Sequence, residues 1–176
     1  KFAQIPMLEP SDSQESKDMI ADAYALSEAH DTPAMIRMTT RVSHSKGIVE
    51  ISEEPPKKLT PEGFKRDLKK NVMIPAYARL KHPKILVRME EITKYAETTP
   101  LNRIEMGDTN VGIITSGISY HYVKEIMPDA SVLKLGLTFP LSEKLIKKFS
   151  DSVDRLFVVE ELEPFIEEQV KAMGIA

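Results

Sequence analysis

Cationic and hydroxyl side chains gather in the run Arg37-Met38-Thr39-Thr40-Arg41-Val42-Ser43-His44. Residues 34–42 are expected to form a parallel strand, so Arg41 and His44 would lie at its carboxyl end, where α/β folds place groups that contact ligands. These two residues are the candidate catalytic residues, close to substrate or to a domain interface. The alternative is that Arg37 and Arg41 pair with carboxylates across a domain contact, because arginine also suits bidentate pairing.

A second candidate site is the turn Thr115-Ser116-Gly117, which follows a short apolar run and precedes an expected helix. Amide and hydroxyl groups at such a turn can face an anion at the helix N-terminus. Thr115 and Ser116 are therefore the candidate cofactor-binding residues. The alternative is that these residues only cap the helix and pack tightly.

Cations also cluster between residues 57 and 70. They are Lys57, Lys58, Lys65, Arg66, Lys69 and Lys70. Such a cluster could attract an acidic electron-carrier protein or the phosphates of coenzyme A. The alternative is a solvated, lysine-rich connector.

The sequence lacks the motifs of several common binding sites. The run 112–117 has the outer glycine spacing of a phosphate loop, but it lacks the lysine and hydroxyl residue that must follow. No Gly-x-Gly-x-x-Gly run occurs for a dinucleotide. The four histidines are scattered, and the absence of cysteine removes disulfides, thiolate zinc sites and ligands for iron-sulfur clusters. No metal site is predicted.

Composition describes an ordinary globular protein. The 176 residues are 41% hydrophobic and 29% charged, with a net charge of −3, which gives no general basis for binding nucleic acid. No apolar run reaches the length of about 18 residues or more that a membrane span needs. A cytoplasmic location is expected.

The elements that must position these residues fall into three parts. Residues 1–45 are expected to form a β-α-β unit, in which Asp12 and Glu15 have the spacing of a capping box at the start of the helix. Residues 46–110 combine prolines and charges in a connector with one helix, predicted at 84–98. One side of this helix is expected to carry Leu86, Met89, Ile92 or Thr93, and Ala96.

Residues 111–176 are the most regular part. Strands are predicted at 111–114, 131–137 and 155–160, and each is followed by a helix. Ser142 is expected to cap the second of these helices. The βαβαβα order predicts a parallel sheet covered by helices.

Both ends of the chain suggest a piece of something longer. The sequence has no initiator methionine, and it opens on a short strand whose earlier partner is expected to be missing. Apolar segments that would meet the missing strands favour association, so a homo-oligomer is a further expectation.

Six stretches of the chain resemble the alpha subunit of indolepyruvate:ferredoxin oxidoreductase. They are residues 6–12, 37–44, 72–79, 112–120, 129–136 and 159–169. The step Arg41-Val42-Ser43-His44 is also similar to the Arg-Thr-Ser-His step of pyruvate:ferredoxin oxidoreductases, where the first domain passes to the second. The resemblance covers almost the whole chain.

The resemblance implies an enzyme that oxidatively decarboxylates aryl 2-oxoacids to aryl-acyl-CoA. Thiamine diphosphate with magnesium and iron-sulfur clusters serve as its cofactors, ferredoxin accepts the electrons, and a beta subunit completes the enzyme. Residues 1–45 would then be the tail of the pyrimidine-binding domain, and residues 111–176 a domain similar to the transketolase C-terminal domain.

The chain departs from this family at its cofactor motifs. The Gly-Asp-Gly motif for the diphosphate and metal is missing, as are the cluster cysteines and the start of the pyrimidine domain. We therefore expect the fragment itself to bind no cofactor and to be inactive. The alternative is a non-catalytic scaffold or subunit-interface module of another thiamine-dependent 2-oxoacid enzyme.

Overall fold

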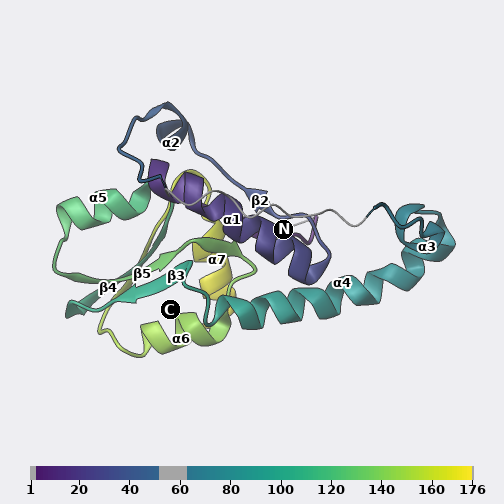
Figure 1. Cartoon of the computed structure of the whole chain (residues 1–176). Helices are drawn as coiled ribbons and strands as arrows, with labels where there is room; N and C mark the ends of the chain where they lie inside the picture. Colours follow the sequence, from purple (N-terminus) through teal and green to yellow (C-terminus); the bar gives the residue numbers. More distant parts are fainter. Residues whose placement is uncertain (1–2, 52–62, 176) are drawn as a thin grey trace.

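The computed structural model describes residues 3–51 and 63–175, which form an α/β body with one long helix projecting from it (Figure 1). The strands are β1 (Met7–Leu8), β2 (Met35–Ile36), β3 (Asn102–Glu105), β4 (Asp108–Ser116), β5 (Ala130–Leu135), β6 (Leu137–Phe139) and β7 (Leu156–Val159). The helices are α1 (Ser13–His30), α2 (Thr40–His44), α3 (Leu68–Asn71), α4 (Pro75–Ala96), α5 (Ser119–Ile126), α6 (Glu143–Ser150) and α7 (Phe165–Ala172).

The larger sheet has the strand order β3-β5-β4-β7. Strand β4 runs parallel to both β5 and β7, which confirms the predicted parallel sheet, and the helices cover both faces. Successive side chains alternate between the faces: Ile113 packs in a cluster with Val123 of α5, whereas Ile114 packs with Ile146 of α6 and Ile166 of α7. The antiparallel edge strand β3 was not predicted.

The smaller sheet has the order β2-β1-β6. Strands β1 and β2 are parallel with α1 between them, as the β-α-β pattern predicts. The strand predicted over 34–42 is wrong beyond its start, because only Met35 and Ile36 pair and residues 40–44 form α2 instead. Pro10 has no amide hydrogen to extend β1, so residues after Arg37 find no strand partner.

Gly136 is the point at which the chain leaves the larger sheet for the smaller one. Its amide donates to the carbonyl of Leu101 at 3.0 Å, and its carbonyl accepts from the amide of Glu9 at 2.8 Å. A Cβ at this position would lie 2.4 Å from the Leu101 carbonyl oxygen, closer than real contacts allow. Only glycine lets β6 cross this closely and join β1 in antiparallel pairing.

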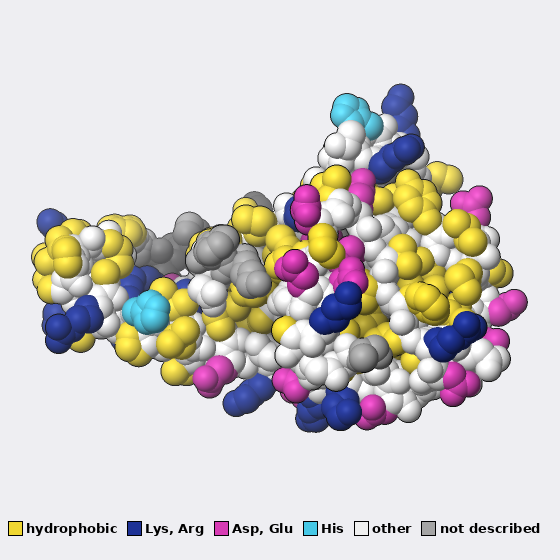
Figure 2. Space-filling model, turned by 180° about the vertical axis from the view of Figure 1, so that it is seen from behind, with side chains coloured by type: hydrophobic (Ala, Val, Ile, Leu, Met, Phe, Trp, Pro, Cys, Tyr) yellow, Lys and Arg dark blue, Asp and Glu magenta, His cyan; other side chains and the backbone are white. Residues whose placement is uncertain are grey.

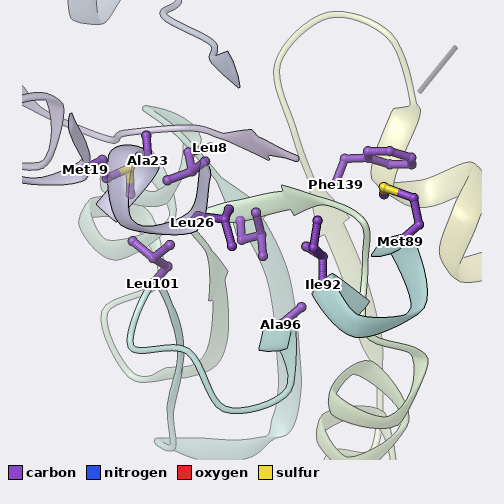
Figure 3. Close-up of a cluster of buried hydrophobic side chains, with 10 residues drawn as sticks. Leu8, Met19, Ala23, Leu26, Met89, Ile92, Ala96, Leu101 and Phe139 are labelled. Carbon is purple, nitrogen blue, oxygen red and sulfur yellow. The ribbon is translucent and has the colours of Figure 1, made fainter. Parts of the chain in front are cut away.

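Side chains from distant parts of the chain form one core beside the smaller sheet (Figure 3). This core contains Leu8 of β1, three residues of α1, three of α4, and Leu101, Leu137 and Phe139. The residues are Leu8, Met19, Ala23, Leu26, Met89, Ile92, Ala96, Leu101, Leu137 and Phe139. The N-terminal unit, the connector helix and β6 therefore pack together. The division at residues 45 and 110 stays a prediction.

Helix α4 starts earlier than predicted, at Pro75 rather than near residue 84, and Pro83 lies inside it. Of the predicted inner face, Met89 and Ala96 are buried as expected. Leu86 is 50% exposed, whereas its neighbour Ile85 packs against the core. The buried half begins only at Met89.

Candidate functional site

The turn after β4 brings a candidate residue against a buried carboxylate. Ser116 ends β4, and Gly117 takes a left-handed conformation with φ of 52°, which glycine adopts without strain. The Ser116 hydroxyl donates to Oε2 of Glu9 at 3.1 Å. A Cβ on residue 117 would lie 3.7 Å from the same oxygen, so the turn passes close beside Glu9.

Glu9 is the centre of this arrangement and is only 4% exposed. Arg37 forms an ion pair with it, with Nε 3.0 Å from Oε1, and also donates from Nη2 to Oε2 at 3.3 Å. The Thr138 hydroxyl donates to Oε1 at 3.1 Å. We call Glu9, Arg37, Ser116 and Thr138 the Glu9 cluster. It satisfies a buried charge by pairing and hydrogen bonding, as burial requires.

Thr115 lies deeper than Ser116. Its side chain is fully buried, and its hydroxyl has no hydrogen-bond partner in the described part of the chain. The register pairs Thr115 with Lys134 of β5, so the two side chains share one face of the sheet. Neither Thr115 nor Ser116 offers an exposed hydroxyl to a ligand.

Lys134 is the largest fully buried side chain of the described residues. Its ammonium group forms an ion pair with Glu15 of α1 and donates to the Ser11 hydroxyl at 3.1 Å. Glu15 also pairs with Arg103 of β3, with Nη1 3.1 Å from Oε1. The Lys134 and Arg103 cations each lie 5.0 Å from the centre of the Tyr120 ring. We call Ser11, Glu15, Arg103, Tyr120 and Lys134 the Lys134 cluster.

Charges in the Lys134 cluster change the pKa of its members. Burial acts to raise the pKa of Glu15, but the hydrogen bond and charge of Lys134 and two hydrogen bonds from Ser11 outweigh it and lower the pKa from 4.5 to about 2. Burial lowers the pKa of Lys134, while the Glu15 carboxylate opposes that change. Glu15 is therefore a carboxylate at neutral pH.

The predicted capping box at α1 is present in a modified form. The Asp12 carboxylate accepts from the Glu15 amide at 2.8 Å, which confirms the predicted cap. Glu15 reaches back to the amide of Ser11 at 2.9 Å rather than to that of Asp12. The Glu15 side chain thus both caps the start of α1 and neutralises the buried Lys134 of β5.

Arg41 and His44 lie on α2 with exposed side chains. Neither side chain has a hydrogen bond or ion pair to the described residues, and buried Val42 anchors the helix between them. The structure brings Arg37 and Ser116 together through Glu9, but it does not bring Arg41 or His44 into that cluster. Arg37 pairs with the Glu9 carboxylate, as the alternative of arginine–carboxylate pairing predicts.

Sequence reasoning did not single out Glu9 or Lys134. It singled out Glu15 only as part of a capping box, and not as the ion-pair partner of Lys134 in the sheet. A signal was present for Lys134, because it lies within an apolar strand where a charge needs a partner.

Lys57 and Lys58 of the predicted basic cluster lie outside the described residues. Across residues 3–51 and 63–175, no group of three histidine or acidic side chains is placed to hold a metal ion. The helices described there are too short or too polar to cross a membrane.

Comparison with protein-family models gives no match. Among curated proteins, the chain is 39% identical over 180 residues to indolepyruvate oxidoreductase subunit IorA of Archaeoglobus fulgidus, covering 100% of this chain and 29% of that protein. It is 44% identical over 181 residues to the subunit of the same name from Pyrococcus horikoshii, covering 97% of this chain and 28% of that protein. The chain thus spans less than a third of the length of these relatives.

A solved structure has a similar fold. It is a 2-oxoglutarate:ferredoxin oxidoreductase from Magnetococcus marinus with 2-oxoglutarate, coenzyme A and succinyl-CoA bound. The TM-score is 0.64 at 16% identity, over 96% of this chain and 37% of that chain. Together with the sequence relatives, it confirms the resemblance that the sequence stretches indicated.

Proposed function

We propose that this chain, a relative of part of the indolepyruvate oxidoreductase subunit IorA, serves as a segment of the alpha subunit of a 2-oxoacid:ferredoxin oxidoreductase. The supporting observation is 35–44% identity to six subunits of that name, each over nearly the whole chain. The reaction of the whole enzyme would be oxidative decarboxylation of aryl 2-oxoacids such as indolepyruvate to aryl-acyl-CoA. Ferredoxin would accept the electrons, a beta subunit would complete the enzyme, and its location would be cytoplasmic.

Within that enzyme, we assign this segment a joining role. The Glu9 cluster ties β1 to the end of β4, and the Lys134 cluster ties the start of α1 to β5 and β3. Both clusters satisfy their charges inside the chain. The burial of both hydroxyls and the hydrogen bond from Ser116 to Glu9 favour packing over ligand binding for Thr115 and Ser116.

Thiamine diphosphate does not fit the Thr115-Ser116-Gly117 turn as it stands. The Ser116 hydroxyl already donates to the Glu9 carboxylate, and a diphosphate placed there would meet that negative charge. The cofactor and its magnesium, like the iron-sulfur clusters, would belong to other parts of the enzyme.

Arg41 and His44 stand exposed on α2, without a hydrogen bond or ion pair to any described residue. In the complete enzyme with its beta subunit, Arg41→Ala and His44→Ala are each expected to lower indolepyruvate-dependent ferredoxin reduction by about 10- to 100-fold, the loss of a charge-assisted contact to substrate or a neighbouring domain. Assembly, followed by size-exclusion chromatography, should be unchanged.

Lys46→Ala is the matched control, because Lys46 is a nearby exposed cation. Unchanged turnover in both variants would rule out a site role for Arg41 and His44. Dissociation of the subunits would instead identify this stretch as a scaffold. Activity that favours a branched or simple 2-oxoacid over indolepyruvate would point to another thiamine-dependent enzyme as the parent.

The isolated chain is expected not to bind the cofactor. Calorimetric titration with thiamine diphosphate and magnesium is expected to give no binding heat, whereas the complete alpha subunit under the same conditions binds. The physical reason has two parts. The candidate phosphate-binding turn lies against the Glu9 carboxylate, and the described residues contain no group of side chains placed to hold the metal. Saturable binding to the isolated chain would refute the proposed absence of a cofactor site.

A further inference from the structure

The surroundings of helix α4 change at Pro83. After this proline, Ile85 packs against the core beside the smaller sheet, and Met89 and Ile92 belong to that core. Before it, residues 63–82 form an arm that extends away from the body (Figures 1 and 2). No side chain of the arm is buried. Apolar packing therefore holds the second half of α4 in place, but not the arm.

Pro83 also weakens the helix at this boundary. Proline has no amide hydrogen, so the carbonyl of Arg79 lacks the hydrogen bond that an uninterrupted α-helix would give it. Sharp bends in helices occur most often at prolines for this reason. The junction of arm and body thus coincides with the point at which α4 bends most easily.

Asp31, the residue that ends α1, is contacted from both sides of Pro83. On the body side, Arg88 donates from Nη1 to the Asp31 carbonyl at 2.8 Å. On the arm side, the Lys70 ammonium lies 2.6 Å from Oδ1 of Asp31. Lys81 donates to the Lys70 carbonyl at 2.6 Å, which fixes α3 to α4 within the arm. The arm is thus tied to a carboxylate that the body itself holds in place.

The contact between Lys70 and Asp31 is an exposed ion pair. The two side chains are 51% and 71% exposed, respectively. The hydrogen bond from Lys70 outweighs burial and lowers the pKa of Asp31, and the charges of Lys81 and Arg88 act in the same direction. Asp31 is therefore a carboxylate at neutral pH. Exposed ion pairs contribute little to stability and are screened by salt, so this contact forms and breaks easily.

An open groove of about 700 Å³ borders this contact. The arm contributes Lys70 and Lys81 to its walls, and the second half of α4 contributes Lys84. Asp31 lines the groove from the end of α1. Because no side chain of the arm is buried, a bend at Pro83 would widen the groove without exposing any core residue. The bent and unbent arms therefore differ little in free energy.

We propose that Asp31 is an electrostatic latch and Pro83 a hinge, which together give the arm two positions. In the latched position Lys70 pairs with Asp31, as in the structure. In the open position the arm bends at Pro83, the groove widens, and Lys70 is free to pair elsewhere. Salt, or an anionic group that competes for Lys70, opens the latch. The position of α3 can thus be switched while the core stays intact.

The absence of cysteine allows a direct test with spin labels at Met73→Cys in the arm and Tyr24→Cys on α1. Double electron–electron resonance on the whole chain is expected to give mainly one distance at low salt, and a second distance that grows as salt rises. Asp31→Asn should raise the ratio of open to latched arms by up to about fivefold, the most that an exposed ion pair supplies. Asparagine tolerates the left-handed conformation of residue 31, with φ of 47°, and it keeps the carbonyl that Arg88 contacts.

Glu28→Gln is the matched control for the latch. It removes an exposed acid near the end of the same helix, one that pairs with no described residue, and should leave the distances unchanged. Lys70→Met removes the same ion pair from the arm side and should reproduce the Asp31→Asn result. An equal response of Asp31→Asn and Glu28→Gln, or distances that neither salt nor Lys70→Met alters, would overturn the latch.

Pro83→Ala tests the hinge. Alanine returns an amide hydrogen to the helix, so the second distance should disappear even when Asp31→Asn is also present. Circular dichroism of each variant should match that of the parent chain, because every substituted side chain lies outside the core. A second distance that persists in Pro83→Ala would show that the arm bends elsewhere, and would refute Pro83 as the hinge.

Discussion

Replacing Glu15 by alanine is expected to lower the free energy of unfolding by about 3 kcal/mol, because it leaves a buried lysine without its partner. Lys134 is fully buried and its ammonium group pairs with Glu15. The same carboxylate also accepts from the Ser11 amide, so α1 loses part of its cap. Urea denaturation followed by circular dichroism measures the change.

Three variants separate the ion pair from a general effect of substitution. Glu28→Ala removes an exposed acid from the same helix and should change stability by less than about 0.5 kcal/mol. Lys134→Met should cost less than Glu15→Ala, about 1 kcal/mol, because Arg103 still neutralises Glu15. Adding Lys134→Met to Glu15→Ala should restore stability, and purely additive losses would contradict the pairing.

The pH dependence gives an independent check on the same pair. The folded pKa of Glu15 is about 2, below its ordinary value of 4.5, so its stabilisation is complete above about pH 4.5. The contribution is lost as the pH falls through this range towards 2, because the proton binds the unfolded chain more readily. The Glu15→Ala variant should lack this part of the acid dependence.

Sequence patterns predicted the elements whose signals are local. Ser142 caps α6 by accepting from the Leu145 amide at 3.1 Å, and Asp12 caps α1 in the same manner. The parallel strands β4, β5 and β7 follow from short apolar runs separated by helical patterns. These features depend on neighbours in the chain, so the residues themselves contain the information.

Elements that depend on distant partners escaped prediction. Strand β3 is polar and is a strand only because β5 offers an open edge to it. Strand β6 continues the apolar run of β5, and only the close approach of Leu101 to Gly136 separates the two. The pairing of β6 with β1 spans most of the chain, and no local pattern encodes it.

The candidate site shows the same limit. The expectation for Ser116 rested on its position before a helix, which is correct, but its partner Glu9 lies 107 residues away in sequence. Glu9 was not singled out, because an acid next to Pro10 at a strand end ordinarily faces solvent. Only the fold shows that the strand end is covered by β4 and β6.

Replacing Glu9 by alanine is the second large effect, with an expected loss of about 3 kcal/mol in the free energy of unfolding. The Ser116 hydroxyl would be left buried without its acceptor, the Thr138 hydroxyl would keep only its longer bond to the Met7 carbonyl, and Arg37 would lose its ion pair. Denaturation of the isolated chain measures the loss. Glu163→Ala, at an exposed position, is the matched control and should have little effect.

Ser116→Ala distinguishes the structural reading of this cluster from a cofactor site. Alone it is expected to cost about 1.5 kcal/mol, the loss of one hydrogen bond to a charged group. In the Glu9→Ala background it should cost much less, because its partner is already absent. Undiminished cost there, or lost turnover in the complete enzyme without loss of stability, would mean that the Ser116 hydroxyl serves a ligand instead of holding β1 against β4.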